Sequence, residues 1–258
     1  MWNKKIYHPW SHMHLKRIRR RLKETSYLKI RDIKKEVTMA NSKDMTINGH
    51  VQTVVADPSP LGLLGLALVT LVASTSKMGI TEGVVYVVPW AIFLGALAQF
   101  VAGIFDFKHN NTFGATAFCG YGFFWFAMAL FYMISSGMIC KGIAVDVHQM
   151  GYAFLGYFAF TFIMTFGAMG AHKVLFMIFF LIDFLFLGLF MSTLGWGGEM
   201  WHYMAAYAEL GVAIFSIYGS GAIALNKHYG FTVLPIGAPF GPWAKKAAII
   251  KASNGLSA

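Results

Sequence analysis

The sequence predicts an all-α integral membrane protein with six transmembrane helices. Its 258 residues are 57% hydrophobic and only 12% charged, whereas a soluble domain devotes about a quarter of its residues to charge. Apolar runs of about twenty residues recur along the chain, the length that crosses a hydrocarbon core of about 30 Å. These runs are continuous and do not alternate with polar residues, which favours helices over the strands of a barrel.

Residues 1–50 are expected to form a basic cytoplasmic arm. They hold thirteen Lys and Arg residues against four acids, so +9 of the chain's net charge of +10 lies there. The arm lacks the apolar segment of a secretory signal peptide. Two interpretations stay open: the stretch 14–35 is a surface helix on anionic lipid, or the arm is a disordered tail that only fixes topology. We favour the tail.

The first transmembrane helix is expected to begin in the stretch 57–63, which reads Asp-Pro-Ser-Pro-Leu-Gly-Leu, and to continue over 64–76. Asp57 is placed to accept hydrogen bonds from the free N–H groups of the first turn. A proline in that turn is harmless, because the N–H it removes has no partner within the helix.

Five further helices are expected between short polar turns, at about 84–105, 111–139, 150–171, 174–194 and 203–225. The transmembrane domain then comprises residues 51–237, and a short basic tail follows at 238–258.

Six crossings place both termini on the same side of the membrane. The linkers after the second and fourth helices and the tail carry six Lys residues, while the loops on the other side carry only Lys77 and Lys141. Because Lys and Arg concentrate in cytoplasmic loops, we expect both termini in the cytoplasm and the protein in the plasma membrane.

The third helix has an unusual composition. Its first part, Asn111 to Trp125, combines small residues, hydroxyls and aromatic rings without a charge. A helix that faces only lipid does not need this polarity, so we expect it to face other helices or a pore. Cys119 and Cys140 lie about 30 Å apart along it, too far for a disulfide.

Two acids fall inside predicted helices, Asp183 and Glu209. Intramembrane charges are costly and usually face the interior of a bundle. Each acid is interpreted either as a proton-handling group or as a neutral acid hydrogen-bonded to a neighbouring helix. Asp106 and Glu199 are expected in solvated loops.

Enzyme chemistry is not predicted. The sequence contains no P-loop, nucleophile elbow or dinucleotide fingerprint. The nine histidines lie in the arm or at helix ends, where no pair is placed to hold haem or a metal within the membrane. We therefore expect no catalytic residues, no metal and no cofactor.

The motif at 57–63 resembles the Asn-Pro-Ala-Pro-Leu-Gly-Leu signature of the acetate uptake transporter (AceTr) family, which includes bacterial acetate/succinate permeases and fungal acetate/ammonia transporters. The likeness continues at 98–99, 102–103 and 111–125 and resumes at 230–237, so it covers about residues 56 to 237. The basic arm lies outside it.

The resemblance implies a six-helix protomer assembled into a hexamer, with a path for small monocarboxylates in each protomer. In the bacterial permeases, Phe, Tyr and Leu side chains form a hydrophobic constriction. Tyr121 matches the tyrosine, Leu66 stands at the phenylalanine position, and Ile182 falls near the leucine. Asp57 replaces the asparagine of the signature, and Ser59 replaces its alanine.

We therefore expect transport of acetate and similar small monocarboxylates, with succinate as a further candidate, through an anion channel or by proton-linked symport. The expected path has a constriction at Leu66, Tyr121 and Ile182. Its mouth is expected at Asp57, Pro58, Pro60, Leu61 and Gly62, and its polar lining at Gln99, Asn111, Thr112 and Thr116. Asp183 and Glu209 are the candidates for proton handling. The expected partners are the small carboxylate, the lipid bilayer and further copies of the chain, with no nucleic acid.

Two alternatives stay open. The first is a pore for neutral solutes, such as ammonia or undissociated acid. The second is a non-transporting membrane sensor or scaffold that uses the basic arm as its contact surface. Asp57 has two interpretations as well: it favours the protonated acid over the anion, or its cap bonds hold it away from the path.

Overall fold

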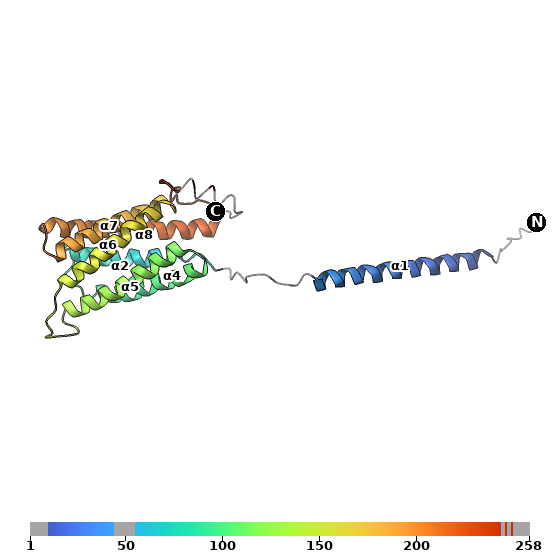
Figure 1. Ribbon diagram of the computed structural model, residues 1–258, viewed down its shortest axis with the longest axis horizontal. Coiled ribbons are helices and arrows are strands. Elements are labelled where there is room, and N and C mark those ends of the chain that lie inside the picture. The colour runs from blue at the N-terminus through green and yellow to red at the C-terminus, as the bar shows by residue number, and fades with distance from the viewer. Residues whose placement is uncertain (1–9, 44–54, 244–245, 247–248, 250–258) are drawn as a thin grey trace, which may run out of the picture. The chain divides into compact units, whose positions relative to one another are not determined.

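The structure is a computed structural model that describes residues 10–43, 55–243, 246 and 249 (Figure 1). The chain divides into two compact units, Met1–Thr53 and Val54–Ala258. In both units, every regular element of the described residues is a helix.

The first unit contains one long helix, α1 (Trp10–Lys43). No Gly or Pro interrupts it, and Leu, Lys, Arg and Glu, all good helix formers, recur along it. The side chains of residues 16–36 are all exposed. The disordered tail that we favoured is therefore wrong for this stretch, and the helical interpretation of residues 14–35 is the one that agrees with the structure.

The second unit holds six helical segments long and apolar enough to cross a membrane. They are α2 (Ser59–Lys77), the composite segment Val87–Lys108, α5 (Thr112–Ser135), α6 (His148–Met169), α7 (Lys173–Thr193) and α8 (Glu199–Tyr229). This confirms the six-helix prediction. All the ends agree within four residues, and the largest differences lie at the end of α5 and at both ends of α8.

The composite segment joins α3 (Val87–Trp90), the π-helical stretch η1 (Ala91–Ala98) and α4 (Gln99–Lys108). Pro89 removes one backbone donor and loosens the helical ladder there. Gln99, the first residue of α4, is buried, and its Nε2 donates to the Gly95 carbonyl oxygen at 2.8 Å. Hydropathy predicted a helix at 84–105 but gave no sign of the π-helical stretch η1.

The helices run side by side (Figure 1), with α8 packed between α2 and α7, α6 packed on α7, and α5 on α4 and η1. Small residues allow close approach, as expected for helices in lipid. A Cβ on Gly65 of α2 would overlap the Leu94 carbonyl oxygen. In contrast, α5 and α6 hardly touch through their backbones, and Tyr157 bridges them by donating to the Gly120 carbonyl oxygen at 3.0 Å.

The segment after α8 folds back onto the α6–α7 turn. The Val174 N–H donates to the Ile236 carbonyl oxygen at 3.1 Å, and the Phe240 N–H donates to the Met169 carbonyl oxygen at 2.9 Å. Gly237 adopts a φ of +80°, and a Cβ there would also overlap the Lys173 side chain. The motif at 232–237 therefore has a structural role, because it holds the segment after α8 against the α6–α7 turn.

Candidate substrate pathway

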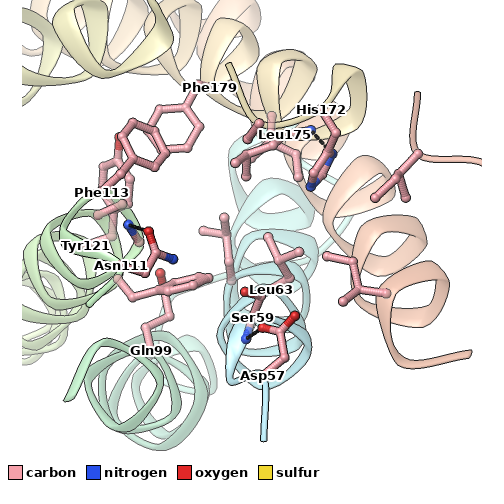
Figure 2. Close-up of a pocket in the computed structure, with 18 of the residues that line it drawn as sticks. Asp57, Ser59, Leu63, Gln99, Asn111, Phe113, Tyr121, His172, Leu175 and Phe179 are labelled. Carbon is pink, nitrogen blue, oxygen red and sulfur yellow. Dashed lines mark hydrogen bonds between the residues drawn. The ribbon is translucent and has the colours of Figure 1, made fainter. Parts of the chain in front are cut away.

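A cavity of about 280 Å³ lies inside the bundle (Figure 2). We call it the central cavity. Its walls come from α2, α4, α5, α7, α8 and the segment after α8. The lining residues are Asp57, Ser59, Leu63, Leu66, Gln99, Asn111, Phe113, Gly114, Ala117, Phe118, Tyr121, Ala171, His172, Leu175, Ile178, Phe179, Ile182, Ile223, Lys227 and Ile236.

The three residues expected at the constriction, Leu66, Tyr121 and Ile182, all line this cavity and are buried. They come from three different helices, α2, α5 and α7. The Tyr121 ring lies 5.9 Å from the Phe179 ring, centroid to centroid, and its hydroxyl lies 3.0 Å from Thr161 Oγ1. Large apolar and aromatic side chains therefore narrow the interior, and the function of these three residues as a constriction stays a prediction.

A second cavity, of about 560 Å³, adjoins the first at the end where α2 begins. We call it the mouth cavity. The two cavities share Asp57, Ser59, Asn111 and Lys227. The mouth cavity adds the polar or charged residues Asp106 and His109 and the carbonyl end of α4.

Three helices begin at this end of the central cavity, and in the first turn of each a backbone N–H donates to a side chain (Figure 2). Asp57 Oδ1 accepts from the Ser59 N–H at 3.0 Å, Asn111 Oδ1 from Gly114 at 3.1 Å, and His172 Nδ1 from Leu175 at 3.1 Å. Helix N-termini carry partial positive charge and attract anions. Lys227, near the end of α8, adds a full positive charge to the lining.

His172 is a lining residue that the sequence analysis placed only at a helix end. Its Nδ1 accepts a backbone N–H, so that nitrogen carries no proton, and the neutral ring holds its proton on Nε2. Burial lowers the pKa of His172 below its ordinary value of 6.5, while the negative charge of Asp57 acts in the opposite direction. The only feature of the sequence that could have indicated His172 was its position directly before an apolar helix.

Asp106 corrects a prediction. We expected a solvated loop residue, but Asp106 lies in α4 and is only 1% exposed. Its Oδ1 accepts from Asn111 Nδ2 at 3.0 Å, and its Oδ2 has no hydrogen-bond partner among the described residues. The prediction failed because α4 continues to Lys108 and α5 begins close by, so the carboxyl group is covered by the start of α5. Glu199, the other such acid, is exposed.

The polar residues expected along the path divide into two groups. Gln99 and Asn111 line the central cavity, and Gln99 Oε1 is buried without a hydrogen-bond partner in the described part of the chain. Thr112 is exposed at the start of α5 and lines neither cavity. Thr116 lies in a separate groove between α5 and α6, next to Gly120 and Gly156.

The motif at 57–63 is partly lining and partly packing. Pro60 lines the mouth cavity, and its carbonyl oxygen accepts from Ser220 Oγ at 2.7 Å. Gly62 packs against the Phe118 ring so closely that a Cβ would overlap it. Pro58 is the buried N-cap residue of α2, and Leu61 is 44% exposed.

Of the two intramembrane acids, Asp183 lies near the central cavity without lining it. Its Oδ2 lies 2.7 Å from Thr165 Oγ1, and Thr165 Oγ1 lies 3.0 Å from the Thr161 carbonyl oxygen. Thr161 Oγ1 in turn contacts the Tyr121 hydroxyl. Asp183 is therefore connected to Tyr121 of the cavity wall only indirectly, through Thr165 and then through the carbonyl and the hydroxyl group of Thr161.

Glu209 lies at the opposite end of the bundle from the mouth cavity. Its Oε2 lies 2.9 Å from Lys77 Nζ, at the end of α2, and the two side chains are 2% and 15% exposed. This ion pair differs from both interpretations made from the sequence, because the partner is a charged group.

The sequence profile of the GPR1/FUN34/yaaH family matches residues 42–238. The chain belongs to this family. The succinate-acetate/proton symporter SatP of Escherichia coli (strain K12) is 33% identical over 187 residues, 72% of this chain and 97% of that protein. The solved structure of the bacterial acetate channel SatP matches with a TM-score of 0.67 at 30% identity, over 71% of this chain and 100% of that chain. Ammonia transport outward protein 2 of Saccharomyces cerevisiae is 37% identical over 151 residues, 56% of this chain and 52% of that protein.

The chain is therefore a multi-pass membrane protein from a family of transporters and channels, not of enzymes. This confirms the family resemblance inferred from the motifs. Among the described residues, no group of three or more His, Cys, Asp or Glu side chains is placed to hold a metal ion.

Proposed function

We propose that this protein moves acetate and similar small monocarboxylates across the plasma membrane through the mouth cavity and the central cavity. One observation carries the proposal: Leu66, Tyr121 and Ile182, chosen by resemblance from three distant parts of the sequence, line one cavity. A water molecule takes up about 30 Å³ of the liquid. The central cavity of about 280 Å³ is therefore large enough for a small carboxylate with part of its hydration shell.

The electrostatics of the mouth support a carboxylate. The starts of α2, α5 and α7 and the Lys227 ammonium group attract an anion. Past this end the lining is mostly apolar, so an anion passes only if polar groups replace part of its hydration. The unpartnered Gln99 Oε1 and the Tyr121 hydroxyl belong to polar residues that line this cavity. Gln99 Nε2 carries two N–H bonds and donates to the Gly95 carbonyl oxygen, so its second N–H is a donor for a carboxylate.

Asp183 supports a proton-linked form of this transport. Thr165 has one hydroxyl proton but two acceptors in reach, Asp183 Oδ2 and the Thr161 carbonyl oxygen. Both contacts are full hydrogen bonds only when Asp183 carries a proton and donates it to Thr165 Oγ1. We assign proton handling to Asp183 in preference to Glu209, because Glu209 is held in an ion pair away from both cavities.

The assembly and orientation complete the proposal. The hexamer expected from the resemblance requires faces that are open to other copies. In the most apolar 18-residue stretch of α6, only 22% of the residues are buried. The corresponding share is 44–50% in the other five membrane segments. This exposed helix is our candidate for contacts between protomers. The Lys and Arg distribution supports cytoplasmic N- and C-termini.

A neutral-solute pore is the second candidate, and the acids of the mouth favour it. Asp57 and Asp106 both line the mouth cavity, and an ionised carboxylate there opposes an anion. The yeast relative named for ammonia transport agrees with this alternative. Membrane potential separates the two candidates, since movement of an anion carries charge and movement of ammonia or undissociated acid does not.

The test is uptake of labelled acetate into proteoliposomes of purified protein, with and without an inward proton gradient. Uptake above that of empty liposomes supports the proposal. If the gradient increases it, and Asp183→Asn abolishes that increase while basal uptake persists, transport is proton-linked through Asp183. Uptake equal to that of empty liposomes would remove acetate as the substrate.

Deleting residues 1–38 tests the scaffold alternative, because a transporter keeps its flux without the arm.

A further inference from the structure

Helix α1 exposes an unusual concentration of positive charge. Its described side chains, residues 16–36, include ten Lys or Arg residues and three acids. All of these positions are exposed. A surface of this kind attracts polyanions such as anionic membranes or nucleic acids.

The apolar side chains of α1 are not scattered evenly around the helix. At 100° per residue, four of the five exposed Ile and Leu side chains, Ile18, Leu22, Ile30 and Ile33, fall within a sector of about 120°, and Leu28 lies about 80° outside it. Each of the four is more than half exposed. We call these four residues the apolar sector. Such a sector is left in water unless another apolar phase covers it.

Basic side chains lie in and beside this sector. On the same helical geometry, Arg19, Lys29 and the acid Glu36 fall within it, and Lys23 lies about 20° beyond its edge. Long Lys and Arg side chains extend their charged ends from an apolar surface toward a polar layer. The combination suits the boundary between lipid tails and headgroups, where an amphipathic helix buries one face and binds anionic headgroups with its basic residues.

We propose that α1 lies along the surface of the bilayer that this protein crosses and binds anionic phospholipid headgroups. The charge of α1 is complementary to such a surface. The chain itself keeps the helix near the membrane: 15 residues separate Lys43 from Ser59, the first residue of α2, and they reach at most about 50 Å. The proposal needs only the multi-pass membrane assignment and is independent of the substrate.

Nucleic acid is the other polyanion that fits the charge of α1. It offers no apolar phase for Ile18, Leu22 and Ile33, whereas a bilayer accounts for both the charge and the apolar sector. The observations therefore favour lipid, and nucleic acid becomes an outcome of the test.

The test uses the full chain in lipid vesicles, with Cys119→Ala and Cys140→Ser as the background. One environment-sensitive probe is attached through Leu22→Cys, in the apolar sector, and in a second sample through Tyr27→Cys, about 140° away around α1. Vesicles consist of phosphatidylcholine alone or contain phosphatidylglycerol, with and without a quencher on the lipid chains. Both leaflets have the same composition, so the orientation of the protein does not affect the result.

In vesicles with phosphatidylglycerol, we expect the fluorescence emission of the probe at position 22 to shift to shorter wavelength and to be quenched by the lipid-chain quencher. The emission of the probe at position 27 should change little. High salt and phosphatidylcholine alone should weaken the response. Replacing Arg19, Lys23 and Lys29 with Gln should lower the ratio of bound to free α1 by about fivefold per side chain. Equal responses at the two positions would overturn the proposal, as would a response to added RNA without one to phosphatidylglycerol.

Discussion

Asp57 shows how one side chain affects the mouth of the path. Its Oδ1 accepts from the Ser59 N–H, and the residue lines both cavities. An ionised carboxylate at a helix start cancels part of the attraction that the helix dipole exerts on anions. Asparagine would keep the cap bond and remove the charge.

We therefore expect Asp57→Asn to raise acetate uptake at neutral pH by a few fold in proteoliposomes. Ser59→Ala changes the neighbouring position without changing charge and serves as the control. An unchanged profile of uptake against pH would show that the cap bond keeps Asp57 away from the path.

His172 gives the stability of the protein a pH dependence. It lies in the turn between α6 and α7, outside the membrane segments, and burial lowers its pKa below 6.5. Below about pH 6.5 the unfolded chain binds a proton at this position and the folded chain does not. Protons therefore favour unfolding, and the stability that neutral His172 provides is lost as the pH falls through this window.

We expect the free energy of unfolding in detergent to decrease below about pH 6.5. His172→Asn, which keeps a cap acceptor for the Leu175 N–H, should make this part of the curve flatter. His228→Asn, at an exposed position in the last turn of α8, is the matched control. Parallel curves for wild type and His172→Asn would contradict the assignment.

At the scale of helices, the Lys77–Glu209 pair links α2 to α8. Glu209 is 2% exposed, so removing Lys77 leaves a buried acid without its partner. Loss of one partner of a buried ion pair costs about 3–5 kcal/mol. We expect Lys77→Met to destabilise the protein in detergent by this amount, and the double variant with Glu209→Gln to recover much of it. A double variant as unstable as the single one would show that the pair itself stabilises the bundle.

Glycine contacts set the spacing of α2 and the composite segment. A Cβ on Gly65 would overlap the Leu94 carbonyl oxygen, whereas nothing lies within 4 Å of a Cβ on Gly221 in α8. We expect Gly65→Ala to lower the unfolding free energy by about 1–3 kcal/mol, the usual effect of overpacking. Gly221→Ala should be neutral or slightly stabilising, because alanine is the better helix former. Similar effects at both positions would argue against this close contact.

The sequence was sufficient for the number and approximate limits of the helices, because a hydrocarbon core imposes length and hydropathy on each one. It was not sufficient for features that depend on neighbours. Asp106 is buried because the start of α5 covers it, and η1 depends on the local loss of regular hydrogen bonding. The charge of the arm suggested disorder, while the lack of Gly and Pro over residues 10–43 allowed α1.

For the candidate site, resemblance identified residues of the wall but not the arrangement of the mouth. Leu66, Tyr121 and Ile182 come together because α2, α5 and α7 surround one cavity. His172 was missed because hydrophobic periodicity does not single out a residue at a helix end. Its place in the cavity wall depends on how α7 packs against the other helices. Thr116 lies away from the central cavity because α5 presents it to the groove with α6.

At the scale of the whole molecule, the six-helix unit has anion-attracting helix starts at one end and an ion pair near the other. The mouth cavity joins the central cavity through shared lining residues, and the wall then becomes apolar. The proposed hexamer and the proposed surface-bound α1 add contacts around this path without being part of it. The central claim is therefore that solute crosses through the central cavity of each protomer.

The most direct test compares acetate uptake by Leu66→Trp and Leu64→Trp in proteoliposomes at equal protein content. Leu66 is buried in the cavity wall, while Leu64, on another side of α2, is 41% exposed. A tryptophan at 66 should fill part of the cavity and lower uptake by about tenfold or more, a barrier increase of about 1.4 kcal/mol. Leu64→Trp should transport like wild type. If Leu66→Trp folds and transports as fast as Leu64→Trp, the central cavity is not the path.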